Sequence, residues 1–228
     1  MFLVGVTGGI ASGKSTVSQI LKTQCGCTIV DADQISRDIF QPNEKAYKNV
    51  VDVFGPGILD GNNEINRSVL GDIIFNDISM RKKLNSITHK EIRSKMLWQV
   101  CRAFLRGDRF VVLDVPLLIE TRSLLSFLKH IVVVYVNDDV QVSRLMERDG
   151  LDNNKAIMRI KSQMPLTEKL SFATKVIDNN GSKENTHRQV HDLFKVLKQT
   201  CSLNIYEILI LSSGCLALFY YIFNITYY

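Results

Sequence analysis

The stretch that decides the fold is residues 8–15, which read Gly8-Gly9-Ile10-Ala11-Ser12-Gly13-Lys14-Ser15. It matches the pattern G-x-x-x-x-G-K-[ST] of phosphate-binding loops. The apolar run Phe2–Val6 precedes it, and apolar residues at helical spacing (Val17, Ile20, Leu21) follow it. Glycines let the main chain curl so that successive N–H groups converge on phosphate oxygens. The sequence therefore predicts a strand, a loop and a helix that together bind a nucleoside triphosphate.

Individual residues of this loop have expected roles. A helix that begins near Lys14 directs its positive end at the bound anion. Lys14 would reach the β- and γ-phosphates, and the hydroxyl of Ser15 would hold Mg²⁺. The expected ATP-binding residues are Gly8, Gly9, Ile10, Ala11, Ser12, Gly13, Lys14, Ser15 and Thr16.

Four further apolar runs predict more strands of the same sheet. Each is apolar almost throughout, as in parallel strands that are buried on both faces. Segments of helical length separate them, so the pattern is βαβ and the fold class is α/β. The runs are Cys27–Asp31, Phe110–Asp114, Ile131–Val136 and Lys175–Ile177.

Two helical segments interrupt this alternation. The first, about residues 34–108, is long and has helical patterns at Lys45–Phe54, Asn66–Phe75 and Met80–Leu105. We expect it to form an insertion that covers a substrate. The second, about residues 138–163, is rich in arginine and acidic residues and is a candidate lid.

Three aspartates stand where predicted strands end. Asp31 and Asp33 close the second run, and Asp114 closes the third. The carboxyl ends of parallel strands share one edge, which is also where the first strand delivers the phosphate loop. One of these carboxylates would hold Mg²⁺, with Asp31 and Asp114 as candidates, and another could accept a proton from a substrate hydroxyl. An aspartate at a strand end also commonly caps the next helix, and for Asp31 alone that alternative is equally open.

Two arginines of the candidate lid share one helical face. Arg144 and Arg148 are four residues apart, which places them side by side on a helix. Positive groups on a lid can stabilise the charge that spreads over a transferring phosphoryl group. Arg159 is a further candidate. The alternative of a solvated helix with ion pairs along it stays open.

Composition excludes several classes of protein. The 228 residues are 46% hydrophobic and 22% charged, which is ordinary for a globular chain. The net charge of +5 is spread without a basic run, so no nucleic-acid partner is expected. Five scattered cysteines without pairing indicate free thiols in a reducing compartment. A guanine-selecting N-K-x-D motif is absent, which disfavours a GTPase switch.

The C-terminal residues differ from all that precede them. Ile208–Tyr228 contains no charged residue. As a helix this segment would be about 31 Å long, and the hydrocarbon core of a bilayer is about 30 Å thick. Tyrosines lie toward both ends, as they do at membrane interfaces. The sequence predicts a domain at residues 1–200 followed by a transmembrane helix at about 205–228, with a buried C-terminal helix as the alternative.

Lys195 and Lys198 precede this apolar segment and nothing basic follows it. By the positive-inside rule, the domain would face the cytosol. The mitochondrial outer membrane and the endoplasmic reticulum are both possible locations, and the oligomeric state is left open.

Several segments, in order along residues 1–200, together resemble the dephospho-CoA kinase family. The phosphate loop alone is common to many NTPases, whereas the other segments in this order are more selective. The segments are Thr7 to Ser15, Asp31-Ala32-Asp33, Ile65-Asn66-Arg67 with Leu70 and Ile74-Phe75, Leu84-Asn85 with Ile87-Thr88-His89, Leu113-Asp114-Val115-Pro116-Leu117-Leu118, Arg144-Leu145 with Arg148, and Val176-Ile177-Asp178-Asn179-Asn180-Gly181.

The resemblance implies an activity and an architecture. The activity is phosphoryl transfer from ATP to the ribose 3′-hydroxyl of dephospho-CoA, which yields CoA and ADP. The architecture is a P-loop nucleotide-kinase fold with a five-stranded parallel sheet, a helical acceptor-binding insertion and a lid. A regulatory ATP-binding protein with this fold but little turnover, or a kinase for another nucleotide-like acceptor, are the alternatives.

The resemblance also assigns residues. It makes Asp33 the base that orients or deprotonates the acceptor hydroxyl, and it makes Lys14, Arg144 and Arg148 the other catalytic groups. Acceptor binding would fall to Asp33, Arg67, His89 and Pro116, and Asn179 would lie near the adenine. One departure is Lys90, which stands where the family usually has proline after the histidine, and it bears on the shape of the acceptor pocket around His89.

Overall fold

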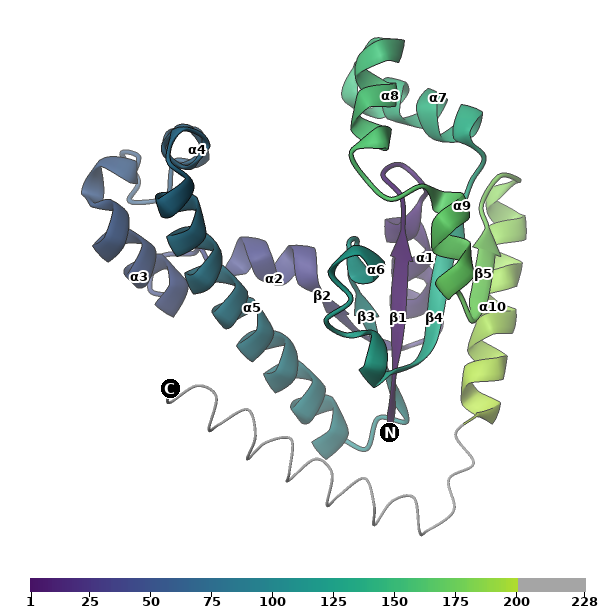
Figure 1. The fold of residues 1–228 in the computed structure, drawn as a ribbon. Coiled ribbons are helices and arrows are strands. Elements are labelled where there is room, and N and C mark those ends of the chain that lie inside the picture. Colours follow the sequence, from purple (N-terminus) through teal and green to yellow (C-terminus); the bar gives the residue numbers. More distant parts are fainter. Residues whose placement is uncertain (201–228) are drawn as a thin grey trace.

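The computed structural model describes residues 1–200, which fold around one five-stranded parallel sheet (Figure 1). The strand order is β2-β3-β1-β4-β5, and every pairing is parallel. The expected parallel α/β sheet is confirmed. The strands are β1 (Phe2–Gly8), β2 (Thr28–Asp31), β3 (Phe110–Asp114), β4 (Leu128–Tyr135) and β5 (Lys175–Asp178).

Burial of the strands follows their place in the sheet. All five residues of β3 are buried, and so are the last five of β1. The expectation of burial on both faces is wrong for the edge strands, because each has only one neighbouring strand. Val30 is the one fully buried residue of β2, and Ile177 is the one buried residue of β5.

Helices cover both faces of the sheet. On one face α1 (Lys14–Thr23) and α10 (Lys183–Gln199) pack on β1 and β4 through a cluster that includes Leu21, Val190 and Leu197. On the other face the C-terminal half of α5 (Ile78–Leu105) packs on β2 and β3. The core is therefore a three-layer α/β/α sandwich (Figure 1).

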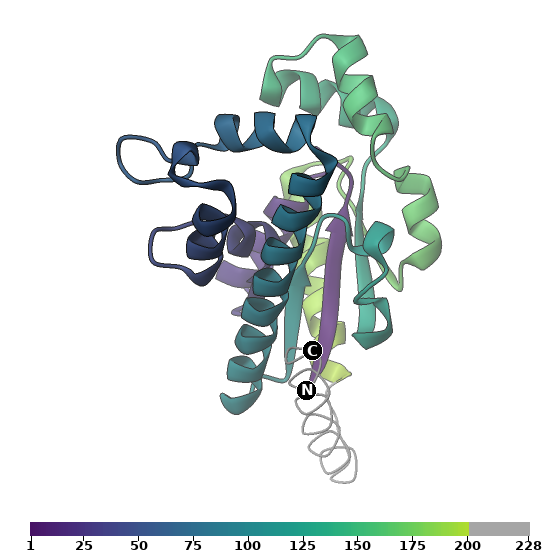
Figure 2. The same ribbon diagram turned by 60° about the vertical axis from the view of Figure 1, so that its left-hand side comes forward.

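The long segment between β2 and β3 is helical, as predicted. It contains α2 (Ala32–Asp38), α3 (Lys45–Phe54), a 3₁₀ turn at Pro56–Ile58, α4 (Arg67–Asn76) and α5. Side-chain caps start three of these helices, because Asp31 accepts from the N–H group of Gln34, Asn66 accepts from those of Ser68 and Val69, and Asp77 accepts from those of Ser79 and Met80. A small apolar cluster of Val50, Ile58, Leu70 and Leu84 joins α3, α4 and the start of α5. This unit extends away from the sheet on the β2 side (Figures 1 and 2).

The second helical segment lies beyond the carboxyl edge of the sheet. It contains α7 (Asp138–Asp149) and α8 (Asn153–Lys161), which cross above the loop that follows β1 (Figure 1). The short helix α9 (Leu166–Lys169) and a 3₁₀ turn at Leu170–Phe172 then lead back to β5, and α6 (Leu118–Thr121) and a 3₁₀ turn at Leu125–Phe127 join β3 to β4. The carboxyl edge is thus flanked by the two helical segments.

No helix within residues 1–200 is long and apolar enough to cross a membrane. The transmembrane helix predicted at about 205–228 lies outside the residues that the structure describes.

Candidate active site

The loop between β1 and α1 has the geometry of a phosphate cradle. Gly13 adopts φ 87°, in the left-handed region, and immediately precedes α1. The first N–H groups of a helix have no acceptor within the helix, and they point at the space in front of it. Within residues 1–200, no group accepts from the loop amides of Ala11, Gly13, Lys14 and Ser15. These four donors are free to take phosphate oxygens.

The strand-end carboxylates converge as predicted. Asp31 and Asp114 are register partners at the ends of β2 and β3. The ammonium group of Lys14 makes an ion pair with Asp114, whose side chain is almost fully buried. Asp31 also accepts from the N–H of Gln34 at 2.9 Å, so it caps α2. The capping alternative for Asp31 is therefore realised, while no group within residues 1–200 donates a hydrogen bond to its second carboxylate oxygen.

Asp33 lies in the first turn of α2, beside this pair of carboxylates. Partial burial raises the pKa of Asp33, Lys14 opposes that shift, and Asp31 and Asp114 add to it. A carboxylate with a raised pKa holds a proton more readily than an ordinary aspartate. Asp33 is therefore suited to accept a proton from a hydroxyl group.

A cavity of about 430 Å³ lies at the phosphate loop beside Asp33. It is lined by the whole loop from Gly8 to Ser15 and by Asp33, Pro116, Arg144, Arg148 and Gln163. Eight loop residues and four further predicted site residues thus face one space.

The lid arginines are held differently from each other. Arg144 lines the cavity and donates to the main-chain oxygen of Asn179 at 3.0 Å. Arg148 also lines the cavity, but two hydrogen bonds tie its guanidinium to Asp149, which raise the pKa of Arg148. Arg159 of α8 reaches the same Asp149 at 2.6 Å. Both arginines therefore face the cavity, Arg148 is also ion-paired along the helix, and their role toward a phosphoryl group stays a prediction.

Six predicted residues are not among those that line the cavity, namely Thr16, Arg67, His89, Asn179 and the two strand-end carboxylates Asp31 and Asp114 described above. Arg67 is exposed at the start of α4, and His89 is exposed on α5. Asn179 is buried beneath the loop, where its amide donates to the Ser12 oxygen at 2.8 Å and accepts from Thr186 at 2.7 Å. Thr16, in the first turn of α1, lies next to the cavity residue Ser15. It stays a prediction that Arg67 and His89 bind the acceptor and that Asn179 contacts the adenine.

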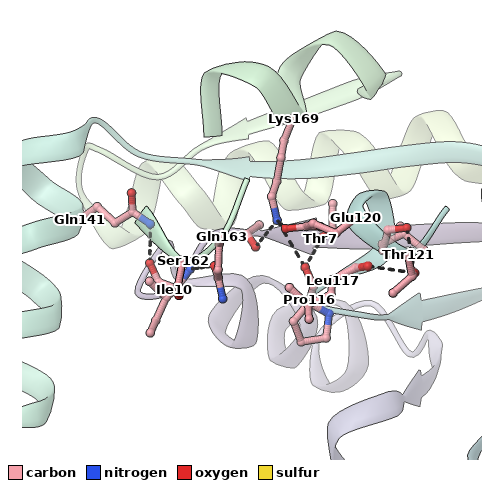
Figure 3. Close-up of polar contacts among 12 residues, drawn as sticks. Thr7, Ile10, Pro116, Leu117, Glu120, Thr121, Gln141, Ser162, Gln163 and Lys169 are labelled. Carbon is pink, nitrogen blue, oxygen red and sulfur yellow. Dashed lines mark hydrogen bonds and ion pairs between the residues drawn. The ribbon is translucent and has the colours of Figure 1, made fainter. Parts of the chain in front are cut away.

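Sequence reasoning missed several polar residues that fix the loop from behind (Figure 3). Gln141 of α7 donates to the main-chain oxygen of Ile10 at 2.7 Å, and Gln163 accepts from the N–H of Ile10 at 2.9 Å. Lys169 is completely buried and points at the start of the loop. A glutamine in a helix or a loop and a single lysine between Glu168 and Leu170 carry no sequence signal of such a role.

The oxygen ligands at this site suit a magnesium ion that also binds water and phosphate. They do not form a metal site made of protein side chains alone. Within the described residues, no three His, Cys, Asp or Glu side chains gather in a way that could hold a metal ion. Mg²⁺ is usually held by one or two carboxylates together with water and substrate phosphates. Ser15, Asp31 and Asp114 supply hydroxyl and carboxylate oxygens of that kind beside the loop.

This arrangement is that of a P-loop kinase, since the phosphate cradle, a carboxylate suited to deprotonate a hydroxyl and two arginines face one cavity. The family model for dephospho-CoA kinase matches residues 2–185, and the chain belongs to that family. A dephospho-CoA kinase domain-containing protein of Danio rerio is 54% identical over 190 residues, which are 83% of this chain and 82% of that protein. A dephospho-CoA kinase of Geobacillus kaustophilus is 48% identical over 196 residues, 86% of this chain and 95% of the bacterial one.

A solved structure from the same family shares the fold. A solved structure of dephospho-CoA kinase from Campylobacter jejuni superposes with a TM-score of 0.66 at 28% identity, covering 87% of this chain and 98% of that one. The predicted fold class and the predicted family are both confirmed.

Proposed function

We propose that the protein transfers the γ-phosphoryl group of ATP to the ribose 3′-hydroxyl of dephospho-CoA and releases CoA and ADP. One observation carries the proposal for this chain. Asp33 and Lys14 line the same cavity as the phosphate loop, so a hydroxyl group and a triphosphate can meet there. Relatives named dephospho-CoA kinase match more than four fifths of the chain, which supports the choice of acceptor.

The chain's own groups suffice for a balanced transfer. Asp33 takes the proton of the acceptor hydroxyl as the bond from that oxygen to the γ-phosphorus forms. The bond between the γ-phosphorus and the oxygen that bridges to the β-phosphate breaks, and ADP leaves. Lys14, which pairs with Asp114 in this structure, exchanges that carboxylate for phosphate oxygens when ATP binds.

Arg144 and Arg148 face the cavity from the lid. Their positive charges stabilise the negative charge that spreads over the outer oxygens of the transferring group. Ser15, Asp31 and Asp114 are the residues that would hold Mg²⁺, which neutralises charge on the β- and γ-phosphates when it is bound. The proposed ion is thus held at the edge where the strands end.

The test is production of CoA by the full chain. With ATP, Mg²⁺ and dephospho-CoA, we expect equal amounts of ADP and CoA, measured by coupled ADP release and by mass spectrometry of the acceptor. The Lys14→Ala variant should lose at least about 100-fold in kcat, because it removes a charge that faces the phosphates. ADP release by the wild type no faster than by Lys14→Ala would refute the proposed enzyme, and release with adenosine or another nucleotide but not with dephospho-CoA would refute the acceptor.

We also propose that residues 205–228 anchor the protein in a membrane with the kinase domain in the cytosol, at the mitochondrial outer membrane or the endoplasmic reticulum. Ile208–Tyr228 has no charged residue, whereas Lys195 and Lys198 precede it. An uncharged run of this length matches the thickness of a bilayer.

The anchor makes a simple prediction for fractionation. The full chain should stay with membranes after carbonate extraction, and a version that ends at Thr200 should be released. Insertion of two arginines in the middle of the segment should also release the chain, because each charge at the centre of a bilayer costs about 2.5–3.5 kcal/mol on insertion scales. Release of the full chain by carbonate would contradict the anchor.

A further inference from the structure

Lys169 is a fully buried cation behind the phosphate loop, at the end of α9. Its ammonium group lies 2.7 Å from a carboxylate oxygen of Glu120, and it donates to the main-chain oxygens of Gly8 at 3.3 Å and Pro116 at 3.5 Å (Figure 3). We propose that Lys169 is a positioning residue that sets the phosphate loop against the segment after β3 and thereby sets the affinity for ATP. The proposal rests on the function proposed above.

The two carbonyl groups belong to two different parts of the site. Gly8 ends β1 and is the first residue of the phosphate loop, whereas Pro116 follows Asp114 by two residues and itself lines the cavity. Thr7 adds a second link, because its hydroxyl donates to the same Pro116 oxygen at 2.8 Å. One ammonium group therefore ties the strand that carries the loop to the segment that carries the partner of Lys14.

The energetics indicate that this cation serves more than packing. An ionised lysine without solvent contact is costly to bury, and an apolar side chain of similar volume would often be as stable or more so. Within residues 1–200, no group donates a hydrogen bond to the buried carboxylate oxygens of Glu120, and the ion pair with Lys169 is what compensates its charge. The ion pair carries no net charge, so what Lys169 supplies to the site is its pair of hydrogen bonds to the Gly8 and Pro116 oxygens, at the cost of desolvating both charged partners.

α9 also connects this cation to the lid. Gln163, which accepts from the N–H of Ile10, stands between α8 and α9, and Lys169 lies six residues later. The segment that returns from the lid therefore holds the phosphate loop at two points, one at Gly8 and one at Ile10. Displacement of this segment would move the loop.

The decisive experiment separates positioning from stability with paired variants of the full chain. Lys169→Met leaves Glu120 buried without its cation, so it should lower the midpoint of thermal unfolding. Lys169→Met combined with Glu120→Leu removes both charges and should recover most of that midpoint. If Lys169 positions the loop, the double variant should still bind a non-hydrolysable ATP analogue about tenfold more weakly by calorimetry, with the KM for ATP raised by a similar factor.

Thr7→Val supplies a test that leaves the charge pair intact. It removes one donor from the Pro116 oxygen without changing the shape of the side chain, and we expect the KM for ATP to rise about threefold with the unfolding midpoint nearly unchanged. Wild-type affinity for the analogue in the double variant, or in Thr7→Val if the double variant does not fold, would overturn the proposal. Because the affinity is measured without an acceptor, it decides the role of Lys169 even if dephospho-CoA proves not to be the substrate.

Discussion

Replacement of Asp33 by asparagine is expected to lower kcat by about 100- to 10,000-fold and, at neutral pH, to raise the midpoint of thermal unfolding. The activity falls because an amide cannot accept the proton of the acceptor hydroxyl. The stability rises because folding places the ionised Asp33 in a partly desolvated position beside Asp31 and Asp114, which raises its pKa. The two measurements are steady-state kinetics and thermal unfolding.

The stability gain has a defined dependence on pH. A carboxyl group whose pKa is raised by folding destabilises the folded state at pH values above that raised pKa, and this cost disappears as the pH falls below the pKa of the unfolded chain. The midpoints of Asp33→Asn and the wild type should therefore converge in acid. The acid limb of kcat/KM for the wild type should likewise lie at a higher pH than the pKa of an ordinary aspartate.

Asp38→Asn is the matched control for this change. Asp38 lies in the same helix, and its side chain accepts from Gln34, which an asparagine at that position can also do. We expect wild-type kcat and an unfolding midpoint without the pH-dependent gain. Full activity of Asp33→Asn would remove Asp33 from the proton-accepting role.

Gly13→Ala is expected to lose both stability and activity. A Cβ atom at Gly13 would lie far inside van der Waals contact with the amide nitrogen of Asn179, and the backbone there is in the left-handed region. That amide is not free to move, because it donates to Ser12 and its oxygen accepts from Thr186. The backbone strain and a lost buried hydrogen bond together predict about 3–5 kcal/mol less stability, measured by denaturant unfolding, and ATP binding too weak to detect.

Gly107→Ala separates the two causes. Gly107 has φ 81°, close to that of Gly13, but a Cβ atom there would meet nothing within 4 Å. The strained backbone alone should lower the stability of this variant, by about 1–2 kcal/mol. It should keep full activity. Equal losses for the two alanine variants would show that the contact between Gly13 and Asn179 contributes nothing.

The sheet and most of the loop site were predictable from sequence because local patterns carry them. Five short apolar runs mark the strands. The motif at residues 8–15 predicts a phosphate-binding loop after the first of them. The convergence of Asp31, Asp33 and Asp114 followed from a general property of parallel strands, whose carboxyl ends share an edge. Helix α3 was predicted at its observed bounds, Lys45–Phe54, since its apolar residues repeat at helical spacing.

The polar support of the loop could not be predicted, because its partners are far apart in sequence. Gln163 and Ile10 are 153 residues apart, and Lys169 and Gly8 are 161 apart. Burial of a lysine side chain depends on what packs over it, which no local pattern reveals. Asp31 illustrates a different limit, because the same residue can cap a helix and face a metal, and sequence alone does not choose between them.

The direction of the parallel strands has a practical consequence. Every strand points its carboxyl end at the phosphate loop, so Met1 and the end of α10 lie at the opposite end of the domain (Figures 1 and 2). Whatever is joined after Thr200 therefore begins far from the cavity. A purification handle, a fluorescent protein or a solid support attached there should leave the entry of nucleotide and acceptor unobstructed, whereas an attachment within α7 would lie beside the arginines that line the cavity.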